Sequence, residues 1–424
     1  MIRFLIKGVL RDRSRSLFSV IAITIGVFLA VVYRGFVAGI FDDMLRQGAI
    51  MMTGHVKVTT RAYAEEAALL PMDLALLGVD ETMEQLSADY PGMFFTPRIV
   101  FGGLIDVPDE EGVTREQGPV AAMAIDLLSS GSRQVELWDL ENRLVDGRLP
   151  QSADEALLGD VYARRLMVVP GDIVTLIGST MHGAFTTHNF TIVGTVAIGV
   201  GSLGKNLLLT DISGARQALD MADGATEILG FYTDMFYDDD AAVARAADYN
   251  AARNGTGDEF APYMVPLRDQ YNMGAMLDYM DVAVVIFIGV FFIVITIVLW
   301  NLGIMNSLRR YGELGVRLAI GESKAHVFGS MVIESTVVGI GGWLVGTAIG
   351  LAVVYYLQEV GIDYGAMMED FNMPISHVMR GKITPDSFYL GLFPGVVAPV
   401  VGTMLAGRAI FKREMSQLFK ELEA

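Results

Sequence analysis

The sequence predicts an integral membrane protein with four transmembrane α-helices and one large α+β extracytoplasmic domain, inserted between helices 1 and 2. Two observations lead to this fold class. Apolar residues collect in four long blocks, and charges of opposite sign lie in different parts of the chain. The chain has 424 residues, of which 52% are hydrophobic. Length alone would suggest two or three soluble domains, so the uneven distribution of these residues decides the class.

Each apolar block is long enough to cross a bilayer, which takes roughly 20 residues of α-helix. The blocks are Leu17–Ile40, Val282–Met305, one within Val327–Leu357, and Ser387–Ala409. A buried helix of a soluble protein rarely stays apolar on all sides over this length. Basic residues precede the first block, as in a signal peptide, but its apolar run is too long and no A-x-A cleavage pattern follows. We therefore expect an uncleaved first span.

Charge is segregated along the chain, whose net charge is −18. Basic residues stand before the first span, between the second and third spans, and after the fourth. Residues 41–280 instead contain 36 Asp and Glu against 15 Lys and Arg. Because Lys and Arg concentrate on the cytoplasmic side of membrane proteins, we expect both termini in the cytoplasm. The acidic soluble surface also disfavours nucleic-acid binding.

The expected boundaries follow from the blocks and the charges. They are a cytoplasmic basic N-terminus (1–16), transmembrane helix 1 (17–40), the extracytoplasmic α+β domain (41–280), helix 2 (281–305), a cytoplasmic coupling segment (306–326), helix 3 (327–357), an extracytoplasmic loop (358–386), helix 4 (387–409) and a cytoplasmic tail (410–424).

Within residues 41–280 the pattern mixes strands and helices. Alternation and short apolar runs predict strands at 55–60, 97–107, 118–127, 156–159, 172–178 and 228–236. Helix formers predict helices at 80–90, where Asp80 can act as the N-cap, and at 211–222 and 241–253. Residues 190–210 are expected to form a β-hairpin with a Gly-rich turn.

That Gly-rich turn contains most of a phosphate-binding loop. Gly199, Gly204 and Lys205 have the spacing G-x-x-x-x-G-K, but Asn206 replaces the Ser or Thr that holds magnesium. A strand-like run follows in place of a helix, and the expected topology puts the loop away from cytoplasmic ATP. We therefore expect no ATP hydrolysis on this chain, and any ATP-driven work requires a separate ATPase.

No other pattern supports catalysis or metal binding. The five His are scattered, and the G-x-S-x-G and H-E-x-x-H motifs do not occur. The chain has no Cys, so no disulfide stabilises its outer domain. We expect no enzyme activity, no metal and no cofactor on this chain.

The segment Asn306–Val327 between spans two and three mixes Arg, Glu and Gly with regularly spaced apolar residues. An ordinary basic loop beside the lipid headgroups is one interpretation, and an amphipathic helix that docks a partner is the other. On a helix, Arg310 and Glu313 share one face. Leu314 and Leu318 would bury against a groove on a partner or against the chain's own membrane helices.

Small residues and ionisable groups within the spans lead to further predictions. Gly342, Gly346 and Gly350 form a small-xxx-small ladder, which lets two membrane helices approach closely, although Gly is frequent in membrane helices generally. Glu334 and Arg34 are expected to snorkel towards the interface. Two prolines, Pro394 and Pro399, should kink span four.

The order of these parts resembles the permeases of FtsX/MacB-type ABC transporters. The run YGELGVRLAIGESKAHVFGSMVIES is similar to that family's E-x-G-x-x-x-A-x-G segment, with Glu313, Gly315, Ala319 and Gly321 in place. ALLGDVYARRLMVVPGDIVTLIG and FTIVGTVAIG look like the family's MacB-type periplasmic core domain. Tyr33–Phe36 (YRGF) and Gly54–Val58 (GHVKV) are similar to the lipoprotein-releasing branch, the LolC/LolE-type permeases. The tail REMSQLFKELEA differs from the Pro-x-x-Ala-Leu tail that is common in the family.

The resemblance implies a mechanism and a set of partners. Two permease chains, identical or homologous, pair in a bacterial inner membrane and engage a cytoplasmic ABC ATPase dimer, which binds ATP and magnesium. Residues 281–424 would form the FtsX-like permease domain. The residues expected to couple to the ATPase are Arg310, Glu313, Leu314, Gly315, Leu318, Ala319 and Gly321.

Three functions fit the resemblance. In the first, a lipoprotein is lifted from the outer leaflet and passed to a soluble periplasmic carrier, with Gly35 and Phe36 on the substrate path. In the second, the outer domain exports a soluble substrate, as in MacB. In the third, no substrate moves, and an FtsX-like scaffold activates a cell-wall hydrolase. We expect the first.

Overall fold

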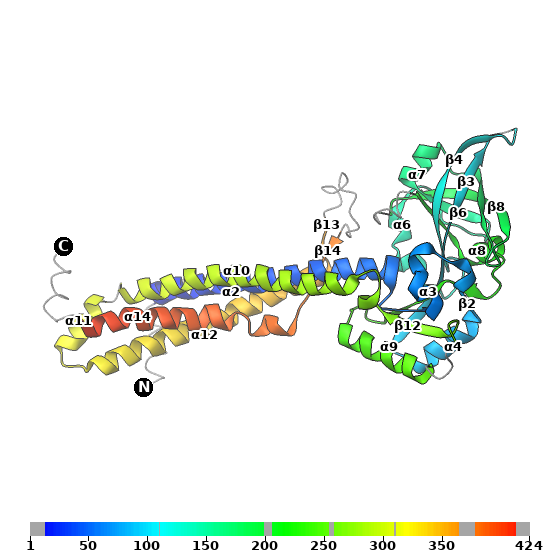
Figure 1. Ribbon diagram of the computed structural model, residues 1–424. Coiled ribbons are helices and arrows are strands. Elements are labelled where there is room, and N and C mark those ends of the chain that lie inside the picture. Colours follow the sequence, from blue (N-terminus) through cyan, green and yellow to red (C-terminus); the bar gives the residue numbers. More distant parts are fainter. Residues whose placement is uncertain are drawn as a thin grey trace. The chain divides into compact units, whose positions relative to one another are not determined.

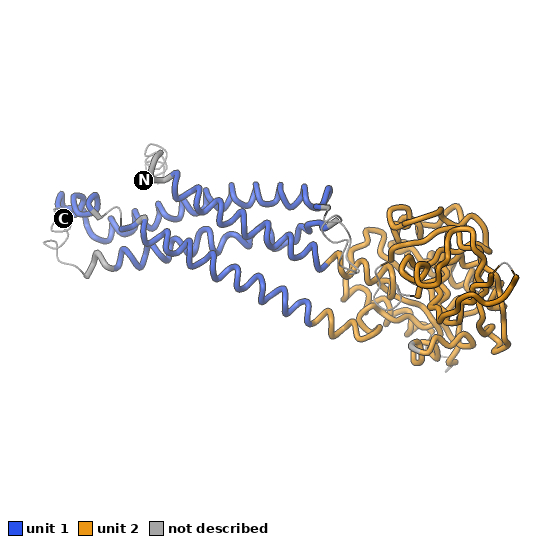
Figure 2. Tube along the Cα trace, turned by 90° about the horizontal axis from the view of Figure 1, so that it is seen from above, with its two compact units in different colours: residues 1–41, 279–366, 377–424 blue, residues 42–278, 367–376 orange. Residues whose placement is uncertain are grey.

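The computed structural model describes residues 13–109, 111–198, 206–253, 258–308, 311–363 and 378–412. The described chain divides into two compact units (Figure 2). The membrane unit contains the described residues up to 41, 279–363 and 378–412, and the α/β domain contains those within 42–278. Within these described ranges, four segments are long and apolar enough to span a membrane. The predicted fold class, four spans with a large domain between the first and second, is confirmed.

The helices of the membrane unit are α2 (Arg13–Gly48), α10 (Met273–Leu308), α11 (Tyr311–Ala319), α12 (Lys324–Glu359) and α14 (Ala398–Lys412). Three of them, α2, α10 and α12, extend beyond the apolar blocks that predict them, and α11 and α14 are shorter (Figure 1). The candidate spans are Leu17–Thr53, Met273–Met305, Lys324–Glu359 and Pro385–Arg408. Two short strands, β13 (Ile362–Asp363) and β14 (Val378–Met379), pair antiparallel after α12.

The fourth span is irregular where the sequence places its prolines. It begins with the 3₁₀ turn η6 (Pro385–Phe388), continues into the π-helix η7 (Phe393–Val397), and becomes α-helical only in α14. Pro394 lies within the π-helix, and Pro399 is the second residue of α14. Proline has no N–H to donate and its ring displaces the preceding turn, so the local departure from α-helix has a direct cause.

The α/β domain is built on one ten-stranded sheet. Its main path runs β12-β1-β11-β3-β4-β9-β6-β8-β5, and β7 pairs with β3 and β8. These strands are β1 (Val56–Thr60), β3 (Met93–Pro108), β4 (Thr114–Ile125), β5 (Leu144–Gly147), β6 (Glu155–Gly159), β7 (Ile173–Ser179), β8 (Phe185–Val196), β9 (Leu207–Asp211), β11 (Glu227–Tyr232) and β12 (Pro262–Pro266). A small separate sheet pairs β2 (Leu76–Leu77) with β10 (Gly224–Ala225).

Six of these strands close into a ring. β7 pairs antiparallel with both β8 and β3, so the order β3-β4-β9-β6-β8-β7 returns to β3. Closure leaves β3 without a free edge where it pairs with β7, at residues 104–106. β12, β1 and β11 extend from β3 beyond the ring.

Two hydrophobic cores lie on opposite faces of the sheet strands, because successive side chains of a strand point to opposite sides. In β4, Ala122 and Ala124 belong to one core and Met123 to the other. The first core includes α4 (Val79–Asp89), α7 (Asp160–Leu166), α8 (Ile212–Ala218) and α9 (Asp239–Arg253), and the second includes α5 (Gln134–Leu137) and α6 (Leu140–Arg143). Shorter helices are α3 (Arg61–Glu66), η2 (Ala67–Leu69), η3 (Met72–Leu74) and η5 (Leu267–Asp269).

The expected hairpin over residues 190–210 is wrong. Both of its strands form, as β8 and β9, but β6 lies between them, parallel to β8 and antiparallel to β9. All five residues of β9 are buried, so its place depends on contacts with distant strands and not on the connection that precedes it. The phosphate-loop-like residues 199–205 lie outside the described residues. Asn206 is followed by a strand, as expected, and its side chain accepts a hydrogen bond from Arg165 at 2.9 Å.

The expected N-cap of the helix near residue 80 is also wrong. Gly78 occupies the cap position with φ of 66°, a left-handed conformation that suits glycine. Asp80 is already helical, and its N–H donates to the Asp223 carboxylate at 3.0 Å. The Val79 N–H donates to the Asp223 carbonyl at 3.2 Å, so two of the helix's orphan donors bond a distant loop.

Candidate coupling segment and surrounding sites

The expected coupling segment forms the amphipathic helix α11, whose buried side packs on the chain itself. Leu314 and Leu318 are 3% and 7% exposed and form a cluster with Val327 and Met331 of α12. Of the two places that the sequence leaves open for these leucines, the structure puts them against the chain's own helix. This contact determines which face of α11 points away from α12.

The other face of α11 carries exposed apolar and charged groups. Val316 is 52% exposed and Ile320 81% exposed. Glu313 and Ala319 are also exposed, and a Cβ on Gly315 would meet no atom within 4 Å. Arg310 lies outside the described residues. The exposed face therefore has the composition of a contact surface, and there is space for a partner protein against it.

A tight turn joins α11 to α12. Gly321 has φ of 96°, which few other residues adopt without strain. Arg317 forms a bidentate ion pair with Glu322, at 2.7 and 2.6 Å, and donates to the Ser330 hydroxyl of α12 at 3.1 Å. These bonds hold α11 at a defined angle to α12.

The glycine ladder of α12 lies against α2. Gly342, Gly346 and Gly350 are buried, and a Cβ on each would come within 2.9 Å or less of an atom of α2. For Gly346 that atom is the Thr24 carbonyl oxygen, at 2.7 Å. The two backbones approach so closely that no side chain fits between them.

Gly35 and Phe36, the expected substrate-path residues, occupy different environments. Gly35 is buried, and a Cβ there would approach Val354 of α12 to 2.6 Å. Phe36 is half-buried. Gly35 thus allows α2 and α12 to pack closely, and its carbonyl accepts a bond from the Lys382 N–H at 2.9 Å.

Arg34, which is expected to snorkel towards the interface, pairs with another residue of the chain. Its Nε donates to the Asp386 carboxylate of η6 at 2.8 Å, and the two side chains are 16% and 28% exposed. This ion pair joins residues 352 positions apart in the chain, which the sequence pattern does not reveal. Glu334, the other ionisable group, is half-buried in α12.

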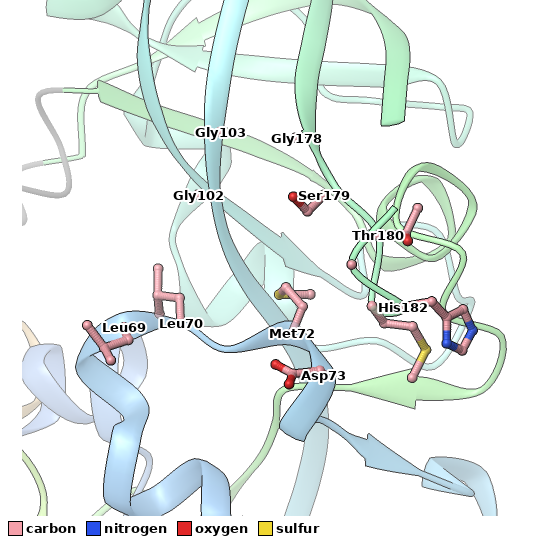
Figure 3. A pocket seen from close by; sticks show the side chains of 12 residues that line it. Leu69, Leu70, Met72, Asp73, Gly102, Gly103, Gly178, Ser179, Thr180 and His182 are labelled. Atoms are coloured by element: carbon pink, nitrogen blue, oxygen red, sulfur yellow. The ribbon is translucent and has the colours of Figure 1, made fainter. Parts of the chain in front are cut away.

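A groove of about 730 Å³ opens in the α/β domain where β3 lacks a neighbouring strand (Figure 3). The ladder of β3 with β11 ends at Arg98, and its ladder with β7 begins at Leu104. Gly102, Gly103 and Gly178 line the groove without side chains. Its lining contains one carboxylate, Asp73, and one imidazole, His182, which form no constellation for catalysis.

No metal site appears within the ranges that the structure describes, where no group of three or more His, Cys, Asp and Glu could hold an ion. His188 instead lies 3.3 Å from the Asp154 carboxylate.

A buried cluster of three charged side chains in the α/β domain is absent from the sequence-based predictions. Lys57 of β1, Arg98 of β3 and Glu227 of β11 are each at most 5% exposed. Glu227 pairs with the Lys57 ammonium, and Arg98 donates to Glu227 at 2.6 Å. The only signal in the sequence is a charge within each of three apolar strands.

Burial raises the pKa of Glu227, but Arg98 and Lys57 outweigh it, so that the pKa lies below its ordinary value. The ionised Glu227 therefore stabilises the fold at neutral pH, and this contribution is lost on acidification through the folded-state pKa.

His55 is buried immediately before β1. Its Nδ1 accepts a hydrogen bond from the Tyr232 N–H at 3.0 Å, so the neutral ring carries its proton on Nε2. Three aromatic rings lie 5.1–5.6 Å away, those of Phe231, Tyr232 and Tyr237. Burial lowers the pKa of His55 to about 4, and a smaller lowering from Arg46 is opposed by Asp234.

We expect His55 to make the fold acid-sensitive between pH 6.5 and 4. In this window the unfolded chain binds a proton that the folded chain does not, so stability falls as pH falls, by roughly 3 kcal/mol over the window. His55→Asn keeps an acceptor near Nδ1 and removes the titration. Unfolding of the full chain should therefore show a wild-type stability that drops relative to this variant below pH 6.5. Parallel pH profiles for the two proteins would contradict the assignment.

Comparisons with known proteins agree with the membrane part of this description. Residues 285–415 match the family model "FtsX-like permease C-terminal". No relative is found among the curated protein sequences.

Two solved structures are similar to this chain. The periplasmic region of MacB from Actinobacillus actinomycetemcomitans has 11% identity and a TM-score of 0.36, and the match covers 54% of this chain and 94% of that one. A domain of a permease protein from Porphyromonas gingivalis has 10% identity and a TM-score of 0.31, covering 51% and 91%. Scores this low do not establish a shared fold. The family match spans most of α10 and all of α11, α12 and α14, so this part of the chain is similar to FtsX-like permeases, as its resemblance to the FtsX/MacB superfamily predicts.

Proposed function

We propose that this chain is the permease subunit of an ATP-driven ABC transporter and passes the motion of a cytoplasmic ATPase to its α/β domain. The observation that carries the proposal is the α11 helix within the FtsX-like domain. Its leucines are buried on α12, while Val316 and Ile320 remain exposed on the opposite side. A partner that contacts this exposed face would move α12 through the buried leucines.

The proposed setting follows the charge distribution and the family. The chain lies in a bacterial inner membrane with both termini in the cytoplasm and the α/β domain in the periplasm. It pairs with a second permease chain, identical or homologous, in contact with membrane lipid. ATP and magnesium bind to the separate ATPase dimer, and no cofactor binds to this chain.

The proposed cargo is a lipoprotein, extracted from the outer leaflet and passed to a soluble periplasmic carrier. Support comes from the resemblance of Tyr33–Phe36 and Gly54–Val58 to the lipoprotein-releasing branch. Export of a soluble substrate and activation of a cell-wall hydrolase are the other outcomes that a cargo assay can distinguish.

We expect Glu313→Lys and Gly315→Trp to weaken ATPase binding. Reversing a charge at an interface costs several kcal/mol, and a Trp side chain would fill the open space beside Gly315. The affinity should fall at least about tenfold, since 1.4 kcal/mol corresponds to a factor of ten. Co-purification of the ATPase, ATP turnover, and release of a lipid-anchored reporter protein from proteoliposomes measure the effect.

Glu359→Lys is the matched control, a charge reversal at an exposed position at the opposite end of α12. It should leave all three measurements unchanged. If the two α11 variants bind the ATPase normally and still release the reporter, the docking proposal fails. Normal ATPase binding by wild type without reporter release would instead exclude the lipoprotein cargo.

A further inference from the structure

Irregular backbone marks both places where the α/β domain connects to the long helices α2 and α10. After α2 the chain forms the π-helix η1 (Ala49–Thr53), and then turns at Gly54, with φ of 64°. Before α10, Tyr271 and Asn272 have φ of 45° and 61°. Backbone bonds hold part of each segment, from the Gly54 N–H to the Ala49 carbonyl and from the Met273 N–H to the Gln270 carbonyl, and side chains add to them. We call residues 49–54 and 270–272 the two joints.

Arg98 holds the first joint. Its Nη1 donates to the Met51 carbonyl at 2.7 Å, and its Nη2 donates to the Met52 carbonyl at 2.6 Å. Carbonyls at the end of a helix lack partners within it, and the planar guanidinium can bond both of these while its Nε bonds Glu227. The end of the π-helix is thereby tied to two strands of the sheet, β3 and β11.

The second joint contacts the same cluster. The Lys57 ammonium, which pairs with Glu227, lies 5.0 Å from the centre of the Tyr271 ring. Gln270 is 6% exposed, and its Nε2 donates to the carbonyls of Thr53 and Val265 at 3.1 and 3.2 Å. Gln270 therefore ties the second joint directly to the first. β1, which carries Lys57, pairs with both β11 and β12.

We propose that Arg98 is a positioning residue that holds the first joint directly and the second through Glu227 and Lys57, so that both joints are rigid on the sheet and a displacement of either joint moves the α/β domain as a body. This inference rests on the proposed function for its purpose, transmission of motion, but the rigidity that it requires can be measured separately. Without Arg98 the joints would flex and absorb the displacement.

Arg98→Lys is the variant that tests this proposal. A lysine keeps the positive charge beside Glu227 but lacks the planar fork that bonds Glu227 and both carbonyls together. Arg115→Lys is the matched control, because Arg115 is 39% exposed on β4 of the same domain and lies 3.5 Å from Asp172.

Amide hydrogen exchange of the full chain in lipid nanodiscs is the first measurement. We expect exchange in Arg98→Lys to accelerate at least about tenfold at residues 49–60 and 262–273. Exchange in β6, β8 and β9 should match that of wild type. Unchanged exchange at the joints, or acceleration spread over the whole domain, would overturn the proposal, because the first means that Arg98 does not hold the joints and the second that its role is general stability.

Reporter release per ATP hydrolysed, in the complex with the ATPase, is the second measurement. Arg98→Lys should lower this ratio at an unchanged level of bound ATPase, whereas Arg115→Lys should not. A normal ratio with flexible joints would overturn the link to transmission. Absence of ATP-dependent release in wild type and in the control would count against the proposed function, and the exchange result would still decide whether Arg98 holds the joints.

Discussion

Replacement of Gly346 by leucine is expected to separate α12 from α2 and to prevent the membrane unit from folding normally. A Cβ at this position would lie 2.7 Å from the Thr24 carbonyl oxygen and 2.9 Å from the Val27 Cβ. The first is a backbone atom of a packed helix and cannot rotate away. Overpacking of a close-packed site costs about 1–3 kcal/mol when the surroundings can adjust, and here we expect at least the upper end of that range.

Gly341→Leu is the control for this substitution. Gly341 lies in the same helix, next to the ladder, and a Cβ there would meet no atom within 4 Å. Both variants place the same side chain in the same helix, so a difference between them reports the contact with α2. Thermal unfolding of the full chain in detergent, together with the yield of folded protein, measures the effect. Equal unfolding temperatures would show that the ladder is not a tight contact.

Replacement of Glu227 by alanine is expected to destabilise the α/β domain by about 3–5 kcal/mol at neutral pH. The substitution leaves the Lys57 ammonium and the Arg98 guanidinium buried without their shared carboxylate. Removing one member of a buried ion pair costs more than the pair contributes, because the remaining charges stay desolvated. Chemical unfolding of the full chain, monitored by hydrogen exchange of the amides in the α/β domain, measures the loss.

Arg148→Ala provides the comparison at a surface ion pair. Arg148 bonds Glu155 with two short contacts, at 2.7 and 2.6 Å, but its side chain is 47% exposed. Exposed pairs of this kind contribute little, because solvent screens them and ordering two long side chains costs entropy, so this variant should unfold close to wild type. A loss for Glu227→Ala no greater than that for Arg148→Ala would mean that water or a rearranged side chain compensates the buried charges.

Secondary structure in the α/β domain was largely predictable, whereas strand pairing was not. The composition of residues 97–107 and 172–178 predicts strands, and these residues form parts of β3 and β7, except that β7 begins one residue later, at Ile173. Residues 190–210 read as a hairpin because adjacent strands commonly pair with each other. The insertion of β6 between β8 and β9 depends on contacts far along the chain, which local patterns do not encode.

In the candidate coupling segment, too, the sequence predicts the local structure but not the tertiary contact. The spacing of Leu314 and Leu318 predicts one buried face, and both are buried. It does not say what covers them, because a partner and the chain's own helix present equally apolar surfaces. The position of α12, and with it the exposed face of Val316 and Ile320, comes from tertiary packing.

The sequence by itself determined the number of membrane spans and the insertion of the large domain after the first. A helix in lipid must be apolar over its whole length and satisfies its backbone hydrogen bonds internally. Each span can therefore be recognised from about 20 consecutive residues. Only the tertiary structure decided the ion pair of Arg34 with Asp386 and the joining of Lys57, Arg98 and Glu227. A buried charge needs a partner, but the fold chooses which distant residue supplies it.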